Sequence, residues 1–118
     1  MKILVIDDSK EITQMLSKFF SSKGLDITIS NDPMDGLTKI RNEKFDAILL
    51  DISMPVVTGI GIIDLLAGDG TLKDQNIFIF SASNIPEVQL KNLLRKDGVK
   101  GFLKKPMELN ELLMTITK

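Results

Sequence analysis

The stretch FDAILLDISMPVVTG, residues 45–59, decides the fold of this 118-residue chain. Its apolar run from Ala47 to Leu50 lacks polar alternation, which is typical of a parallel strand buried on both faces. We expect a strand over residues 46–51 that ends at Asp51. Ligands of open α/β sheets bind beyond the carboxyl ends of the strands, so Asp51 is the central candidate residue. The alternative is an ordinary loop or helix-capping aspartate.

Similar apolar runs recur on both sides of this strand, with helical stripes between them. The other strands are expected at residues 3–6, 27–29, 77–80 and 99–103, and the strand at 27–29 is expected near an edge of the sheet. The apolar helix positions are Ile12, Met15, Leu16, Phe19 and Phe20, then Met34, Leu37 and Ile40, then Ile60, Ile62, Ile63, Leu65 and Leu66, then Val88, Leu90, Leu93 and Leu94, and finally Leu109, Leu112, Leu113 and Ile116.

Local signals set the ends of these helices. Ser9 can cap the first helix and Gly24 can close it. Pro33 suits the first turn of the second helix. Ser83 or Asn84 is expected to begin the fourth helix, with Pro86 in its first turn.

Strands that alternate with helices predict a parallel sheet covered on both faces. The fold class is therefore α/β: a three-layer, doubly wound (βα)5 domain with a five-stranded sheet. Periodicity does not yield the strand order, so the order 2-1-3-4-5 is taken from flavodoxin-like sheets. A single domain over residues 1–118 fits this length.

Composition excludes several classes of function. Fifteen basic and sixteen acidic residues give a net charge of -1, without the basic excess of a nucleic-acid-binding protein. The chain has no cysteine and no histidine, which removes disulfides, thiolate and histidine metal sites, and histidine triads. The first apolar run is too short for a signal peptide or a membrane span, so we expect a cytoplasmic protein without membrane insertion.

Acidic side chains follow two strands that are neighbours in the expected order. Asp7 and Asp8 follow the first strand, and Asp51 follows the third, so these carboxylates should converge. Two carboxylates about 4 Å apart repel by about 4 kcal/mol at an effective dielectric constant near 20, which a dication relieves. Mg²⁺ prefers such oxygen ligands. The alternative for Asp7 and Asp8 is an acidic pair that favours a helix N-terminus.

Two further residues extend this site. A metal would keep Asp51 ionised. A carboxylate can then attack a phosphoryl group, provided that the metal and other cations neutralise the charge on the phosphoryl oxygens. Lys105, after the fifth strand, can supply a cation, and Ser81, after the fourth, can bind a phosphoryl oxygen. The alternatives are a solvated lysine and a capping serine. Lys104 is interpreted as an edge-strand charge.

These residues form motifs that resemble the receiver domain of two-component response regulators, of the chemotaxis-regulator type. The resemblance covers essentially all of the chain. The matching motifs are Asp7-Asp8-Ser9, Asp51-x-x-Met54-Pro55-x-x-x-Gly59, Ser81-Ala82 and Lys105-Pro106.

The resemblance implies that a histidine kinase or a histidine phosphotransfer protein phosphorylates Asp51. It implies that Asp8, Asp51 and the backbone carbonyl of Ser53 bind Mg²⁺, with Asp7 acting mostly through a metal-bound water. The domain would catalyse its own phosphorylation and dephosphorylation as a signalling protein rather than as an enzyme of metabolism.

The resemblance also implies roles for residues near the last two strands. Lys105 would contact the phosphoryl group, and its bond to Pro106 would be cis. Ser81 and Phe102 would form a switch pair. Serine rather than the commoner threonine at position 81 keeps the hydroxyl but loses a methyl group.

Residues 87–106 carry a local charge of +4, so we expect an acidic output protein or a second copy of the chain to dock there. The alternative is a solvated basic helix face. Three rival functions share parts of the pattern. A magnesium-dependent aspartyl-phosphate phosphatase would want an acid where Ser53 stands, and a nucleotide or flavin would be repelled by Asp7 and Asp8. A docking module that works unphosphorylated would not need the acceptor, the acids and the lysine together.

Overall fold

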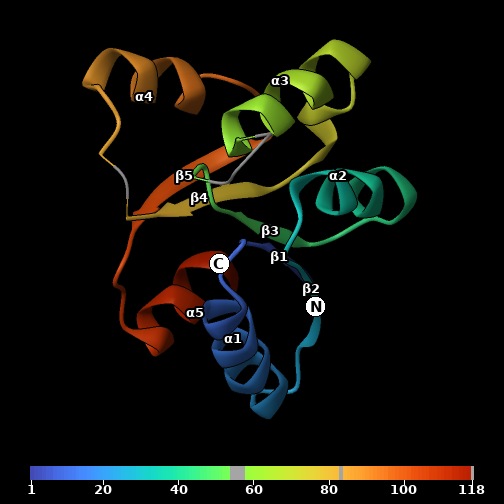
Figure 1. Cartoon of the computed structure of the whole chain (residues 1–118), viewed down its shortest axis with the longest axis vertical. Helices are drawn as coiled ribbons and strands as arrows, with labels where there is room; N and C mark the ends of the chain where they lie inside the picture. The colour runs from blue at the N-terminus through green and yellow to red at the C-terminus, as the bar shows by residue number, and fades with distance from the viewer. Residues whose placement is uncertain (54–57, 83, 118) are drawn as a thin grey trace.

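The computed structural model describes residues 1–53, 58–82 and 84–117. Met54 and Pro55 of the Asp51 motif lie outside this part of the chain, as does Ser83, one of the two expected starts of the fourth helix. Within it, parallel strands form one sheet in the order β2-β1-β3-β4-β5 (Figure 1). The strands are β1 (Lys2–Ile6), β2 (Asp26–Ser30), β3 (Ala47–Leu50), β4 (Ile77–Ser81) and β5 (Val99–Lys104). The predicted strand order is confirmed.

Helices cover both faces of the sheet, as predicted. One layer contains α1 (Lys10–Ser22) and α5 (Leu109–Thr117), and the other contains α2 (Pro33–Asn42), α3 (Gly59–Asp69) and α4 (Glu87–Leu94) (Figure 1). A 3₁₀ turn, η1 (Leu72–Asp74), connects α3 to β4. No helix in the described part of the chain has the length and hydrophobicity needed to cross a membrane.

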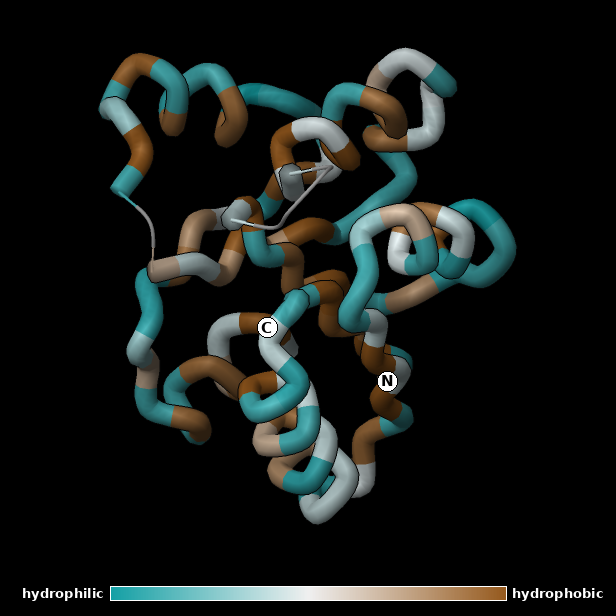
Figure 2. The backbone as a smooth tube through the Cα atoms, in the orientation of Figure 1, coloured by the Kyte–Doolittle hydropathy of each residue, from teal (hydrophilic) through white to brown (hydrophobic). Residues whose placement is uncertain are grey.

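Strands β1 and β3 are buried on both faces because their side chains alternate between the two layers. One set packs towards α2 and α3, and the other packs towards α1 and α5. All members are at most 1% exposed: Ile3, Leu4, Val5, Ile6, Ala47, Ile48, Leu49 and Leu50. Burying one such side chain contributes about 1.5–3 kcal/mol, so this pair of strands anchors the core. In Figure 2 the brown of apolar residues accordingly runs through the centre of the molecule.

The edge position expected for β2 is confirmed, since β2 stands at one end of the strand order, beside β1. The three middle residues of β2 are half-buried. The start of the fourth helix is different from the prediction. Helix α4 begins at Glu87, and Pro86 precedes it instead of lying in its first turn. A proline disfavours helical backbone at the preceding residue, here Ile85, so a helix cannot run from Asn84 through it.

Side chains cap the helices that flank the carboxyl ends of the strands. Ser9 Oγ accepts a hydrogen bond from the backbone N–H of Ile12 at 3.3 Å, which confirms the predicted cap of α1. Thr58 Oγ1 caps α3 by accepting from the N–H of Gly61 at 3.1 Å. These caps satisfy N–H groups that lack partners in the first helical turn.

Gly59, the first residue of α3, lies directly against the main chain that follows β3. A Cβ atom at Gly59 would lie 2.4 Å from the carbonyl oxygen of Asp51 and 2.8 Å from the Cα of Ile52. Real Cβ atoms do not approach other atoms so closely, and main-chain atoms cannot rotate away. The glycine of the Asp51 motif therefore lets α3 start against the loop that carries the candidate acceptor.

We expect Gly59→Ala to lower the free energy of unfolding by about 1–3 kcal/mol, as overpacking against a fixed surface does. Gly68→Ala is the matched control in the same helix, because a Cβ there meets nothing within 4 Å. The control should stabilise the protein by about 0.5–1 kcal/mol. Urea unfolding measures both, and equal stability of the two variants would contradict the steric constraint.

Candidate functional site

The register of the two central strands brings Asp7 and Asp51 together. Ile6 pairs with Leu50, and each aspartate is the next residue along its own strand direction. The N–H of Asp51 continues the ladder by donating to the carbonyl oxygen of Ile6 at 3.0 Å. Both carboxylates are almost fully buried, with 2% of Asp7 and 6% of Asp51 exposed, whereas Asp8 is exposed.

The three aspartates form one cluster. A carboxylate oxygen from each of Asp7, Asp8 and Asp51 lies within 4.8 Å of one from each of the others. Backbone N–H groups orient two of them: Ser9 donates to Asp7 Oδ1 at 2.9 Å, and Ser53 donates to Asp51 Oδ1 at 3.1 Å. The convergence expected from the strand order is therefore present.

Lys105 extends into this cluster from the end of β5. Its Nζ lies 2.5 Å from Asp7 Oδ2 and 3.7 Å from Asp51 Oδ2. The ammonium also lies 5.3 Å from the ring centroid of Phe80, so an aromatic face supports it. Sequence reasoning did not identify Phe80, because an apolar residue in a buried strand gives no separate signal of such a contact.

Main-chain contacts place Lys105 at this point. Its backbone N–H donates to the carbonyl oxygen of Ser81 at 3.0 Å, and its peptide bond to Pro106 is cis. Ser81 itself is fully buried at the end of β4. Strands β3, β4 and β5 thus deliver Asp51, Ser81 and Lys105 to the same edge of the sheet.

Phe102 lies on β5 opposite Ile79 of β4. Its side chain is half-buried and packs against the apolar cluster on the side of α2, α3 and α4. Its neighbourhood is therefore the end of the sheet that carries Ser81, at the margin of the core rather than on the open surface.

Lys104, which was interpreted as an edge-strand charge, makes two hydrogen bonds that the sequence did not predict. Its Nζ donates to the carbonyl oxygen of Ala82 at 2.9 Å and to Asn84 Oδ1 at 2.6 Å. The side chain therefore ties the end of β5 to the loop between β4 and α4. Only the pairing of Ser81 with Lys104 in the sheet brings these residues together, and that register was not known from the sequence.

The donor set suits a hard dication. Three carboxylates facing one ammonium leave a formal charge of −2. All three side-chain ligands offer oxygen, which Mg²⁺ prefers, whereas softer metals favour the histidine and cysteine that this chain lacks. The cluster could therefore hold Mg²⁺.

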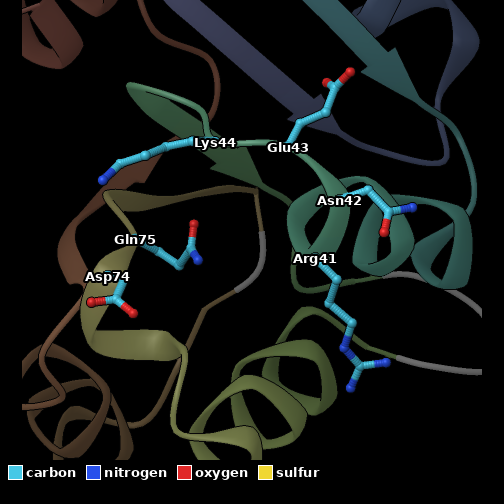
Figure 3. Close-up of a pocket in the computed structure, with 6 residues that line it drawn as sticks. All are labelled: Arg41, Asn42, Glu43, Lys44, Asp74 and Gln75. Atoms are coloured by element: carbon cyan, nitrogen blue, oxygen red, sulfur yellow. The ribbon is translucent and has the colours of Figure 1, made fainter.

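A hollow of about 300 Å³ lies at the amino-terminal ends of the strands, away from the aspartate cluster (Figure 3). Residues before β3 and before β4 line it: Arg41, Asn42, Glu43, Lys44, Asp74 and Gln75. Arg41 is paired with Asp69, and the charged ends of Arg41 and Lys44 point away from each other (Figure 3). Because the charged groups around this hollow do not converge on one point, they form no site comparable to the aspartate cluster.

Comparison with known proteins gives a consistent result. The family model of the response regulator receiver domain matches residues 3–117. The response regulator MprA of Mycobacterium tuberculosis is 30% identical over 112 residues, which cover 95% of this chain and 47% of that protein. MprA of Mycobacterium leprae is 28% identical over 98% of this chain and 49% of that protein. The chain thus spans about half the length of these relatives.

Solved structures share the fold over almost the whole chain. The Francisella response regulator 1452 receiver domain is 30% identical with a TM-score of 0.83, covering 98% of this chain and 93% of that one. Chemotaxis protein CheY4 of Vibrio cholerae has the same identity and TM-score and covers 98% and 95%. Response regulator TrrA of Thermotoga maritima, solved in complex with Mg²⁺ and BeF, is 22% identical with a TM-score of 0.82, covering 98% and 96%, and is similar in fold.

The sheet order, the clustered aspartates and the matching family model lead to one conclusion. This chain belongs to the response regulator receiver domain family of two-component signalling, whose general function is phosphorylation on an aspartate.

Proposed function

We propose that Asp51 accepts a phosphoryl group from a histidine kinase or a histidine phosphotransfer protein in a reaction that requires Mg²⁺. The observation that carries this proposal is the position of the Asp51 carboxylate between two other acids and the Lys105 ammonium. An Asp51 oxygen attacks phosphorus, and the phosphorus–nitrogen bond to the donor histidine breaks, so the donor leaves as imidazole.

Asp51 is a better acceptor than Asp7 because their carboxylates have different partners. Asp7 accepts a hydrogen bond from the Ser9 N–H at one oxygen and binds Lys105 at the other. Asp51 accepts from the Ser53 N–H at one oxygen, while its Oδ2 stands 3.7 Å from Lys105, beyond hydrogen-bond distance. That second oxygen can be directed at phosphorus.

We assign the ligands of Mg²⁺ to Asp8, Asp51 and the backbone carbonyl of Ser53, with Asp7 acting through water. When bound, the ion would neutralise charge on the transferring oxygens. The oxygen donors, the formal charge of −2 and the exposure of Asp8 to solvent support this assignment. The Thermotoga protein of the same fold was solved with Mg²⁺ and BeF, which is consistent with it.

Lys105 and Ser81 complete the proposed chemistry. The Lys105 ammonium can turn from Asp7 towards the phosphoryl group, because that group carries a charge of about −1.5 to −2, more than the single negative charge of the Asp7 carboxylate. The Ser81 hydroxyl can donate a hydrogen bond to the attached group. The same residues can serve hydrolysis, in which a water oxygen attacks phosphorus, the bond to Asp51 breaks and the Asp51 carboxylate leaves. The domain is thus proposed to be a signalling protein that catalyses its own phosphorylation and dephosphorylation.

Phosphorylation is proposed to shift the domain between two packings. Movement of Ser81 towards the phosphoryl group carries the following loop with it, and Phe102 responds by packing more deeply. The contacts of Lys104 with Ala82 and Asn84 oppose this movement in the unphosphorylated state. Ser81 and Phe102 are thus the proposed switch pair.

The switched surface is proposed to bind an acidic output protein or a second copy of the chain. Lys105 belongs to the buried site, so residues 87–104 carry the surface charge, which is +3. Val88 on helix α4 is 72% exposed and can add an apolar contact to this surface. Residues 1–118 are proposed to act as one cytoplasmic receiver domain, without direct contact with nucleic acid or insertion into a membrane.

Acetyl phosphate with Mg²⁺ should add one phosphoryl group to the protein, detected as added intact mass that hydroxylamine removes. Asp51→Asn should abolish this addition, because an amide is not a nucleophile. Asp64→Asn, at an exposed position on α3, is the matched control and should be labelled like the wild type. Labelling that survives Asp51→Asn would contradict the proposed acceptor.

Lys105→Met should bind Mg²⁺ about tenfold more tightly, since the wild-type ammonium would repel a dication held by the same carboxylates. The same variant should be phosphorylated more slowly, because it lacks the cation beside the acceptor. Calorimetry and labelling rates measure the two effects. Lys100→Met, an exposed site on β5, controls for general loss of charge. Unchanged affinity and rate in Lys105→Met would remove Lys105 from the site.

Charge reversal of Lys91 and Arg95 to glutamate should weaken capture of the output partner by the phosphorylated protein at least about tenfold, through repulsion of acidic groups. Pull-downs with and without acetyl phosphate measure this. Lys44→Glu, at the far edge of the sheet, is the control. Equal capture by the double variant and the wild type would place the partner on another surface.

A further inference from the structure

The main chain of the Asp7–Asp8 turn is held from the side of β2. The Asp7 N–H donates to the carbonyl oxygen of Ser30 at 3.0 Å. The carbonyl oxygen of Asp7 accepts a hydrogen bond from Asn31 Nδ2 at 2.9 Å. Both polar groups of this peptide segment are therefore paired after β1 has ended at Ile6.

Asn31 uses its amide nitrogen twice. The same Nδ2 donates to Thr13 Oγ1 of α1 at 2.9 Å, so both of its hydrogens have acceptors. A carbonyl oxygen can only accept, which fixes the orientation of the amide. Thr13 is fully buried, and its hydroxyl donates to the carbonyl oxygen of Lys10 at 3.2 Å. Asn31 thus links the ends of β1 and β2 to the first turns of α1.

The corner that carries Asn31 is itself well ordered by hydrogen bonds. Ser30 is 3% exposed, and its single hydroxyl hydrogen is shared between two acceptors, Asp35 Oδ2 at 2.7 Å and the carbonyl oxygen of Asp32 at 2.8 Å. Hydrogen bonds from Lys39 and then from Ser30 lower the pKa of the Asp35 carboxyl. The Asp35 carboxylate thus accepts hydrogen bonds from both Ser30 and Lys39.

We propose that Asn31 is a positioning residue for Asp7 and Asp8, setting the direction of the peptide that joins the two acids proposed to serve Mg²⁺. This inference rests on the proposed function. The partners of the Asn31 amide are the Asp7 carbonyl oxygen and Thr13 Oγ1, not the carboxylate oxygens of the cluster. Asn31 would therefore act through the peptide group that joins Asp7 to Asp8. Rotation of that peptide would displace Asp7 and Asp8 together, while Asp51, which follows β3, would stay in place.

Asn76 provides a matched control at the other edge of the sheet. Its Nδ2 donates to the carbonyl oxygen of Asp46 at 3.0 Å, so it makes the same type of bond to the main chain of an aspartate. That aspartate precedes β3, whereas the Asp51 cluster follows it. Loss of the Asn76 bond therefore measures the effect of such a contact on the structure without altering the cluster of Asp7, Asp8 and Asp51.

The test is calorimetric titration of Mg²⁺ into the unphosphorylated wild type, Asn31→Ala, Asn76→Ala and Thr13→Val. We expect the dissociation constant to rise about five- to tenfold in Asn31→Ala, to rise less in Thr13→Val, which keeps the bond to Asp7, and to stay unchanged in Asn76→Ala. In labelling with acetyl phosphate, Asn31→Ala should need more Mg²⁺ for half-maximal rate and should keep the rate at saturating Mg²⁺ within about twofold.

Wild-type affinity in both Asn31→Ala and Thr13→Val would overturn the inference, as would an equal loss of affinity in Asn31→Ala and Asn76→Ala. If Asn31→Ala does not fold, Thr13→Val decides, with a raised dissociation constant supporting the role and an unchanged one opposing it. A wild type that neither binds Mg²⁺ nor becomes labelled would instead refute the proposed function itself.

Discussion

The parallel pairing of β1 with β3 is the constraint on which the rest of the structure depends. Because Ile6 lies opposite Leu50, the next residues on both strands are aspartates in adjacent positions. The flanking apolar residues alternate into two cores, so a slip by one residue would exchange the faces of the strand and separate the acids. Core packing thus determines where the carboxylates stand.

This packing imposes an electrostatic cost. Burial of Asp7 and Asp51 beside each other is unfavourable unless cations approach them. Lys105 supplies one cation and binds Asp7 more closely than Asp51. The remaining negative charge suits a dication, and the uneven sharing of Lys105 is consistent with the proposal that Asp51 is the carboxylate that reacts. Structure and proposed chemistry therefore follow from the same crowding of charge.

Much of this could be predicted from the sequence because the signals were local. The apolar runs of β1, β3 and β4, the stripe of α1 and the cap at Ser9 depend on neighbours within a few residues. The aspartates and Lys105 were identifiable because each lies within two residues of the end of a strand. The strand order came from a known fold, since periodicity carries no information on which strands are neighbours.

The rest depends on contacts between distant segments. Helix α4 starts later than predicted because Pro86 constrains the residue before it, and only Leu93 of that helix is buried, so its pattern was weak. The roles of Asn31 and Lys104 need the register of the sheet, which brings each beside a loop far away in sequence. A single asparagine or lysine has no periodic partner from which such a contact could be inferred.

The most direct test of the central claim is a crystal structure of this chain with Mg²⁺ and beryllofluoride, which mimics an attached phosphoryl group. We expect beryllium bonded to an Asp51 oxygen, the metal held by Asp8 and Asp51, and Lys105 Nζ moved from Asp7 to a fluoride. An adduct on another carboxylate, or Lys105 still bound to Asp7 beside an occupied Asp51, would contradict the claim.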